Sequence, residues 1–121
     1  MKVVVKRSEW LRGEGASSSS LYRPNDGHRC CLGFVGLACG LTDSDMRNVD
    51  TPQNLGNSLI PKIMERTKLL EKSKYGKGIR DTQICAELMA INDETQKSEE
   101  YREARITELG KMVGIEFEFV D

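Results

Sequence analysis

Short hydrophobic runs at the two ends of the chain predict strands. Near the start, three successive valines follow Lys2, which is a short β-branched run. Near the end, hydrophobic and acidic residues alternate from Ile115 to Phe119, as in a half-exposed strand. Each strand needs a partner and few other strand candidates exist. We therefore expect Val3 to Lys6 and Ile115 to Phe119 to belong to one sheet, with Phe117 buried.

Between residues 31 and 39 the hydrophobic period changes to that of a helix. Five residues recur at helical spacing and predict one buried stripe: Cys31, Phe34, Val35, Ala38 and Cys39. Gly33 and Gly36 fall on another face of the same helix. A glycine inside a helix costs about 1 kcal/mol relative to alanine. We therefore expect a backbone or a ligand to approach this face closely.

Further helix signals follow along the chain. Thr42 with Asp45 resembles a capping box and predicts the start of a short helix. A proline at position 61 suits the first turn of a helix, which we expect over residues 62–72. Asp81 and Ser98 are predicted to cap two more helices.

The predicted fold is α+β, with a small sheet formed by the N- and C-terminal strands and packed against three to four helices. Residues 13–27 are rich in glycine and serine and are expected to form a loop. A chain of 121 residues is long enough for one core, so we expect a single domain over residues 1–121. A two-stranded sheet is marginal alone. A third strand near Leu21–Tyr22, or one supplied by a second subunit in a homodimer, would extend it.

Composition points to a cytoplasmic protein. The first ten residues have three basic side chains around three valines, too interrupted for a signal-peptide core, and no stretch approaches membrane-span length. Two of the four cysteines, Cys30 and Cys31, are adjacent, a spacing that disulfide frameworks rarely use. Free thiols, mostly buried, are therefore expected.

Charge is distributed unevenly, although the net charge is only -1. Residues 61–80 have seven basic and two acidic side chains, whereas residues 81–121 have eleven acidic and four basic ones. The acidic half argues against general nucleic-acid binding. The two segments are interpreted as facing each other or as separately solvated, and the basic stretch, which alternates with acidic groups, is expected on a solvated helix.

The adjacent cysteines are the candidates for enzyme chemistry. A thiol at a helix start is stabilised as thiolate by the helix dipole. The run Cys31-Leu32-Gly33-Phe34-Val35 also resembles the helix start of the NlpC/P60 cysteine peptidases. Such a site needs a later histidine as base, and none follows His28. The spacing of His28 and the cysteines also matches no usual zinc site. We expect no catalytic residue, no metal and no cofactor.

The loop before residue 31 is the candidate binding site. Backbone amides, hydroxyls and guanidinium groups hold phosphate or carboxylate without catalysis. All three gather here, just ahead of a predicted helix start, so we expect an anionic ligand. The candidate residues are Arg12, Gly13, Ser18, Ser19, Arg23, His28 and Arg29. A polar loop without a ligand is the alternative.

Six short motifs run in order along nearly the whole chain: Trp10-Leu11-Arg12-Gly13, Arg29-Cys30-Cys31-Leu32-Gly33-Phe34, Ala38-Cys39-Gly40, Ile91-Asn92-Asp93, Arg102-Glu103 and Gly114-Ile115-Glu116-Phe117. In these motifs the chain resembles a family of small uncharacterised proteins encoded by phages and prophages. The resemblance implies an accessory protein in the host cytoplasm that acts by binding.

The expected function is therefore non-enzymatic: counter-defence, either by sequestering a nucleotide-like anion or by blocking a host or phage protein. No membrane partner is expected. The alternative is a small cysteine-dependent enzyme that uses Cys30 or Cys31, and thiol reactivity near neutral pH separates the two.

Overall fold

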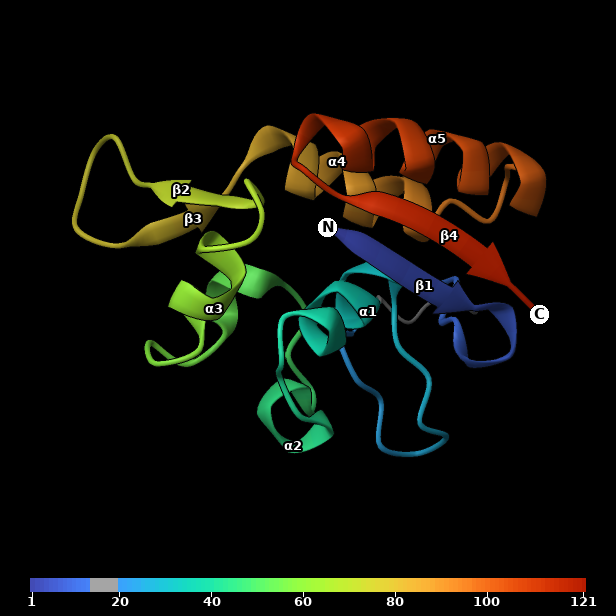
Figure 1. Cartoon of the computed structure of the whole chain (residues 1–121), viewed down its shortest axis with the longest axis horizontal. Helices are drawn as coiled ribbons and strands as arrows, with labels where there is room; N and C mark the ends of the chain where they lie inside the picture. Colours follow the sequence, from blue (N-terminus) through green and yellow to red (C-terminus); the bar gives the residue numbers. More distant parts are fainter. Residues whose placement is uncertain (14–19) are drawn as a thin grey trace.

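Two strands from opposite ends of the chain form the central sheet. The structure is a computed structural model that describes residues 1–13 and 20–121. Strand β1 (Lys2–Lys6) pairs in parallel with β4 (Glu116–Val120), with Lys2 opposite Glu116 and Lys6 opposite Val120 (Figure 1). The expected pairing of the terminal strands in an α+β fold is confirmed, and Phe117 is buried as predicted.

The alternation of residues sets the two faces of this sheet. Val3, Val5 and Phe117 are buried on the inner face. On the outer face Lys2 pairs with Glu118 at 2.7 Å, an exposed ion pair of little energetic weight. Because β1 and β4 are parallel, the chain between them forms the crossover connection that a parallel pair needs.

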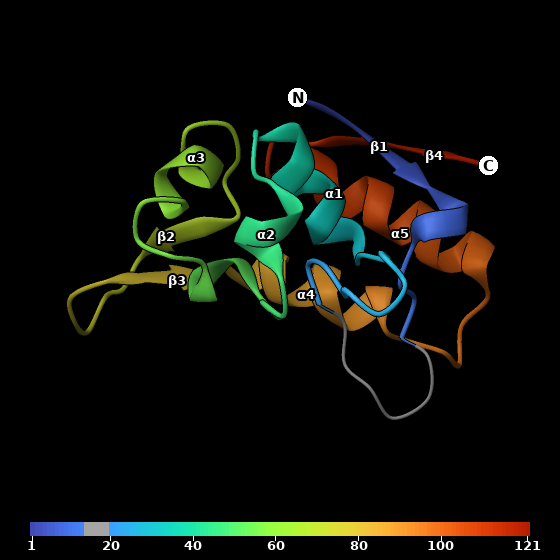
Figure 2. The same cartoon turned by 90° about the horizontal axis from the view of Figure 1, so that it is seen from below.

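Two helices cover the inner side of the sheet, and a third packs against them. Helix α1 (Cys31–Ala38) packs against β1, and α5 (Glu99–Met112) packs against β4. Helix α4 (Gln83–Asn92) lies beside α5 and also contacts α1 (Figures 1 and 2). One hydrophobic core, built mainly from aliphatic side chains and cysteines, joins these elements.

The predicted close approach of a backbone to the glycine face of α1 is confirmed at Gly33, whereas the close neighbour of Gly36 is a side chain. A Cβ at Gly33 would overlap the backbone carbonyl of Leu21, and one at Gly36 would overlap the sulfur of Met46. Any larger residue at Gly33 would therefore push the Leu21 segment away from the helix. Leu21 itself is buried and forms no strand with the central sheet; its neighbour Tyr22 makes a single bridge to Arg47.

The prediction of a helix over residues 62–72 is wrong. Helix α3 (Ile60–Met64) ends early, because the Thr67 hydroxyl donates to the Ile63 carbonyl (3.0 Å) and accepts from the Leu69 amide (3.2 Å). The chain then forms an antiparallel hairpin of β2 (Leu70–Lys72) and β3 (Ile79–Asp81), which projects from the body of the protein (Figures 1 and 2).

The start of α4 also differs by one residue from the prediction. Thr82, not Asp81, is the N-cap, and its hydroxyl accepts from the Cys85 amide at 3.2 Å. Asp81 instead accepts hydrogen bonds from the Thr51 hydroxyl and the Gln53 amide, which ties β3 to the 3-10 helix η2 (Pro52–Asn54).

The other predicted caps are confirmed. Thr42 and Asp45 form the capping box of α2 (Asp43–Met46), and the Ser98 hydroxyl caps α5. A 3-10 turn, η1 (Arg7–Glu9), follows β1. In the described part of the chain, no helix combines the length and the hydrophobicity needed to cross a membrane.

Candidate functional site

Asn92, fully buried at the end of α4, joins three segments that are distant in the sequence. Its Oδ1 accepts from the indole N–H of Trp10 (2.7 Å) and from the backbone amide of Cys31 (3.0 Å). Its Nδ2 donates to the carbonyl of Leu11 (2.9 Å). The segment after η1, the start of α1 and the end of α4 are thereby held in one arrangement.

Arg102 extends this arrangement to α5. Its Nη1 donates to the carbonyls of Arg12 (2.8 Å) and Asn92 (3.1 Å). The residue is only 6% exposed, and its Nε is buried without a hydrogen-bond partner. No carboxylate of a described residue forms an ion pair with it, although burying an unpaired charge costs several kcal/mol.

Arg102 lies in the wall of a pocket of about 660 Å³ between η1, the segment that follows η1 and the start of α5. We call it the arginine pocket, after three of its lining residues; the described residues that line it are Arg7, Ser8, Trp10, Arg12, Gly13, His28, Thr95, Glu99 and Arg102. Among these described residues, the one carboxylate is that of Glu99, which forms an ion pair with Arg12. The described part of the lining therefore has three guanidinium groups and one acidic side chain.

The guanidinium of Arg12 lies over the indole ring of Trp10, 4.8 Å from its centroid. Trp10 is buried, so its ring supports the arginine and offers no free face to a ligand. Arg7 differs, because its guanidinium is already bound by Glu103 (2.8 and 2.9 Å) and by Asp121 (2.8 Å). Arg12 and Arg102 are thus the arginines that a ligand could engage.

The structure brings some of the sequence-predicted site residues together. Arg12, Gly13 and His28 line the arginine pocket. Gly13 has a φ of 73°, a backbone conformation that favours glycine. A Cβ at this position would also overlap the backbone of Asp93. Both reasons exclude a larger residue. The Nδ1 of His28 is 3.4 Å from the Asp26 carboxylate, outside hydrogen-bonding geometry.

Two other predicted residues lie outside this pocket. Arg23 binds the Asp26 carboxylate, with Nε at 3.1 Å, and this contact lowers the pKa of Asp26 to about 2. Arg29 is buried, pairs with Asp43 at 2.7 Å and lies over the rings of two aromatic residues, Tyr22 and Phe34. The remaining two, Ser18 and Ser19, lie outside the described residues.

Sequence reasoning missed most of the pocket: Arg7, Ser8, Trp10, Thr95, Glu99 and Arg102. Arg102 follows acidic residues near the start of a helix, which is typical of a solvated face. Only its position four residues after the Ser98 cap hints that it faces inward. Trp10 had a weak signal, since it is the sole tryptophan of the chain.

The thiols are placed where they do not react readily. Cys30, Cys31, Cys39 and Cys85 are all buried and form no disulfide. Burial raises the pKa of Cys30 to about 12 and raises the pKa of Cys31 well above its usual value. The helix start does not overcome this desolvation. Within residues 1–13 and 20–121, no group of histidine, cysteine and acidic side chains is arranged to hold a metal ion.

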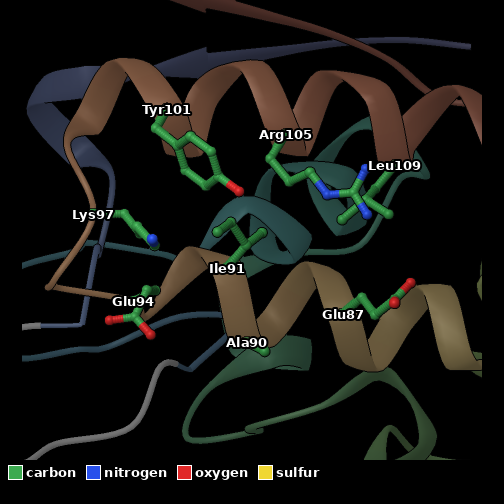
Figure 3. A pocket seen from close by; sticks show the side chains of 8 residues that line it. All are labelled: Glu87, Ala90, Ile91, Glu94, Lys97, Tyr101, Arg105 and Leu109. Carbon is green, nitrogen blue, oxygen red and sulfur yellow. The ribbon is translucent and has the colours of Figure 1, made fainter.

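A second cavity, of about 270 Å³, lies between α4 and α5. Figure 3 shows Tyr101 reaching from α5 toward Ile91 on α4, and Arg105 extending along α5 toward Leu109. Its charged lining residues are two acidic and two basic, Glu87, Glu94, Lys97 and Arg105. This balance favours no class of ligand.

Comparisons of the chain with protein-family models, with curated proteins and with solved structures gave no match. What this site can bind is therefore inferred from its geometry.

Proposed function

We propose that this chain is a non-enzymatic binding protein that holds a small phosphate-bearing anion in the arginine pocket. The observation that supports this most is the burial of Arg102 without a carboxylate partner among the described residues. An anion in the pocket would be the missing counterion. It would add a negative charge where two backbone carbonyls and the Trp10 ring now offset the burial of this guanidinium only in part.

Arg12 would be the second contact to the ligand. Its side chain is partly exposed; it donates to the Arg7 carbonyl at 2.5 Å and pairs with Glu99, which is 52% exposed. An exposed ion pair of this kind is worth at most about 1 kcal/mol. A phosphate that binds the planar guanidinium in a bidentate manner can therefore replace the Glu99 carboxylate at small cost.

Binding, rather than catalysis, suits the chemistry of the lining. Guanidinium groups, two hydroxyls and the Gly13 backbone are groups that hold an anion. The alternative, a cysteine-dependent enzyme, needs a thiolate near neutral pH, and burial raises the pKa of both Cys30 and Cys31. The balance of these observations favours a binder.

The resemblance to small phage-encoded proteins suggests a setting for this activity. In the cytoplasm of an infected host, a protein that sequesters a nucleotide-like signal would act in counter-defence. The ligand class follows from the pocket, whereas the setting follows from the resemblance alone.

Calorimetric titration with inorganic phosphate, AMP and ATP at fixed ionic strength tests the proposal. Arg12→Ala removes the guanidinium, with its hydrogen bond to the Arg7 carbonyl and its contact with the Trp10 ring, but keeps the backbone carbonyl that Arg102 binds. The melting temperature of the variant is measured beside the titration, so that a loss of fold is told apart from a loss of binding. A charge-assisted contact is worth about 1.5–3 kcal/mol, so the variant should bind at least one of these anions roughly ten- to a hundredfold more weakly than the wild type.

Lys68→Ala is the matched control, because Lys68 is an exposed cation outside the arginine pocket. Its affinity for the same anion should equal that of the wild type. Equal losses in both variants would mean that only general charge attracts the anion. No binding by the wild type to any of the three probes would discard the proposed ligand class.

A further inference from the structure

The β2–β3 hairpin, residues 70–81, is anchored at its base and free at its tip. Leu70 is buried, and Asp81 accepts from the Gln53 amide at 3.0 Å. An ion pair between Glu71 and Arg80, at 2.8 Å, joins the two strands. The Ser73 amide donates to the Gly78 carbonyl at 3.0 Å and closes the loop. We call this element the hairpin arm; Figures 1 and 2 both show it extending away from α5.

The tip of the hairpin arm exposes one aromatic ring among lysines. Tyr75 is 95% exposed. Lys72, Lys74 and Lys77 are also exposed, and none forms an ion pair with a described residue. No acidic residue occurs between positions 72 and 78. The tip is therefore a local cluster of three positive charges around an open ring.

Within the part of the chain that the structure describes, the Tyr75 ring is not packed and the three ammonium groups form no ion pair. A tyrosine ring in a folded chain usually packs at least one face, and neighbouring ammonium groups repel one another. Nothing packs against the flanking Gly76 and Gly78 either, since a Cβ at each would meet no atom within 4 Å. A feature that is unfavourable in the free protein is explained most simply by a partner.

We propose that the hairpin arm binds single-stranded nucleic acid. The ring of Tyr75 stacks on an unpaired base, and the lysines contact the neighbouring phosphates. Stacking on an aromatic side chain together with cationic contacts to the backbone is the general mode of sequence-tolerant single-strand binding. Lysine suits such a polyanion, because its ammonium is a point charge on a flexible stem that needs no fixed geometry.

Single strands fit better than the other polyanions. In a duplex the bases are already stacked, so the ring would have no free face to contact. An acidic protein surface would use the lysines but would need a pocket for the ring. The acidic residues of the segment 81–121 would repel a nucleic acid that lay along them. Because the arm extends away from α5, the single strand would contact only the tip of the arm.

Fluorescence anisotropy with a labelled twenty-nucleotide oligo(dT) tests this proposal. With three lysine–phosphate contacts, the slope of log K against log salt should be about -2, because each contact adds roughly -0.7 for a single strand. Lys77→Ala should reduce the slope by about 0.7. Tyr75→Ala should weaken binding about tenfold, whereas Tyr75→Phe should bind like the wild type.

Lys68→Ala is again the control and should leave both the slope and the affinity unchanged. All arm variants should keep the melting temperature of the wild type, because the altered side chains are exposed. The proposal is overturned if the oligonucleotide does not bind at 50 mM salt, or if Tyr75→Ala binds as tightly as the wild type. Equal competition by polyglutamate, which has charges but no bases, would also overturn it in favour of an acidic protein partner.

Discussion

Asn92→Ala should be among the most destabilising single substitutions in this protein. Its side chain satisfies three buried groups: the Trp10 indole N–H, the Cys31 amide and the Leu11 carbonyl. Alanine leaves all three without a partner. At about 1 kcal/mol for each orphaned group, the loss in the free energy of unfolding is about 3 kcal/mol. In a domain of this size that corresponds to a fall in melting temperature of roughly 10 °C or more.

Urea unfolding, followed by the fluorescence of the single tryptophan and by circular dichroism, measures this loss directly. Asn54→Ala is the matched control, because Asn54 is exposed and its amide donates only to Asp50, at 2.8 Å. The control should change stability by less than about 0.5 kcal/mol. A loss below 1 kcal/mol for Asn92→Ala would refute the reasoning, since it would mean that water or other groups replace the amide.

Three further predictions follow from the packing and the charges. Gly36→Leu should destabilise by about 1–3 kcal/mol in thermal or urea unfolding, because a side chain there overlaps Met46; unchanged stability would mean that this face is open. Burial raises the pKa of Cys30 to about 12, so the protonated thiol contributes its full stability below pH 9 and loses that contribution as the pH rises toward 12. In urea unfolding, the midpoint of Cys30→Ala should therefore decline less over this pH range than that of the wild type. Rapid alkylation of Cys30 in the native protein at pH 7 would contradict its description as a buried, protonated thiol. Glu99→Gln should strengthen phosphate binding in calorimetry, because it removes the carboxylate that competes for Arg12; weaker binding would show that Glu99 helps to hold the ligand.

The elements that the sequence predicted correctly are those with a strong local cause. Hydrophobic and acidic residues alternate from Ile115 to Phe119, which predicts a strand with one buried face, and β4 is such a strand. The capping box at Thr42 and the glycine face of α1 likewise depend on neighbours within a few residues. The hairpin arm was missed because three-residue strands are too short to show alternation, and because its lysines share the period of a solvated helix.

The candidate site was only partly predictable, because closeness in sequence is not closeness in space. Arg23 and Arg29 lie near Arg12 in the chain, yet each has its own carboxylate partner elsewhere. Arg102 is 90 residues away from Arg12 and binds its carbonyl. Only the packing of α5 against the rest of the core could bring them together.

The most direct test of the account is an NMR titration of the ¹⁵N-labelled protein with AMP and with inorganic phosphate. The signals expected to move first are the single indole N–H of Trp10, the Gly13 amide and the Arg12 and Arg102 Nε–H groups, since these surround the arginine pocket. The account predicts saturable shifts confined to this set. Shifts centred instead on the α4–α5 cavity, or none at concentrations up to several millimolar, would contradict it.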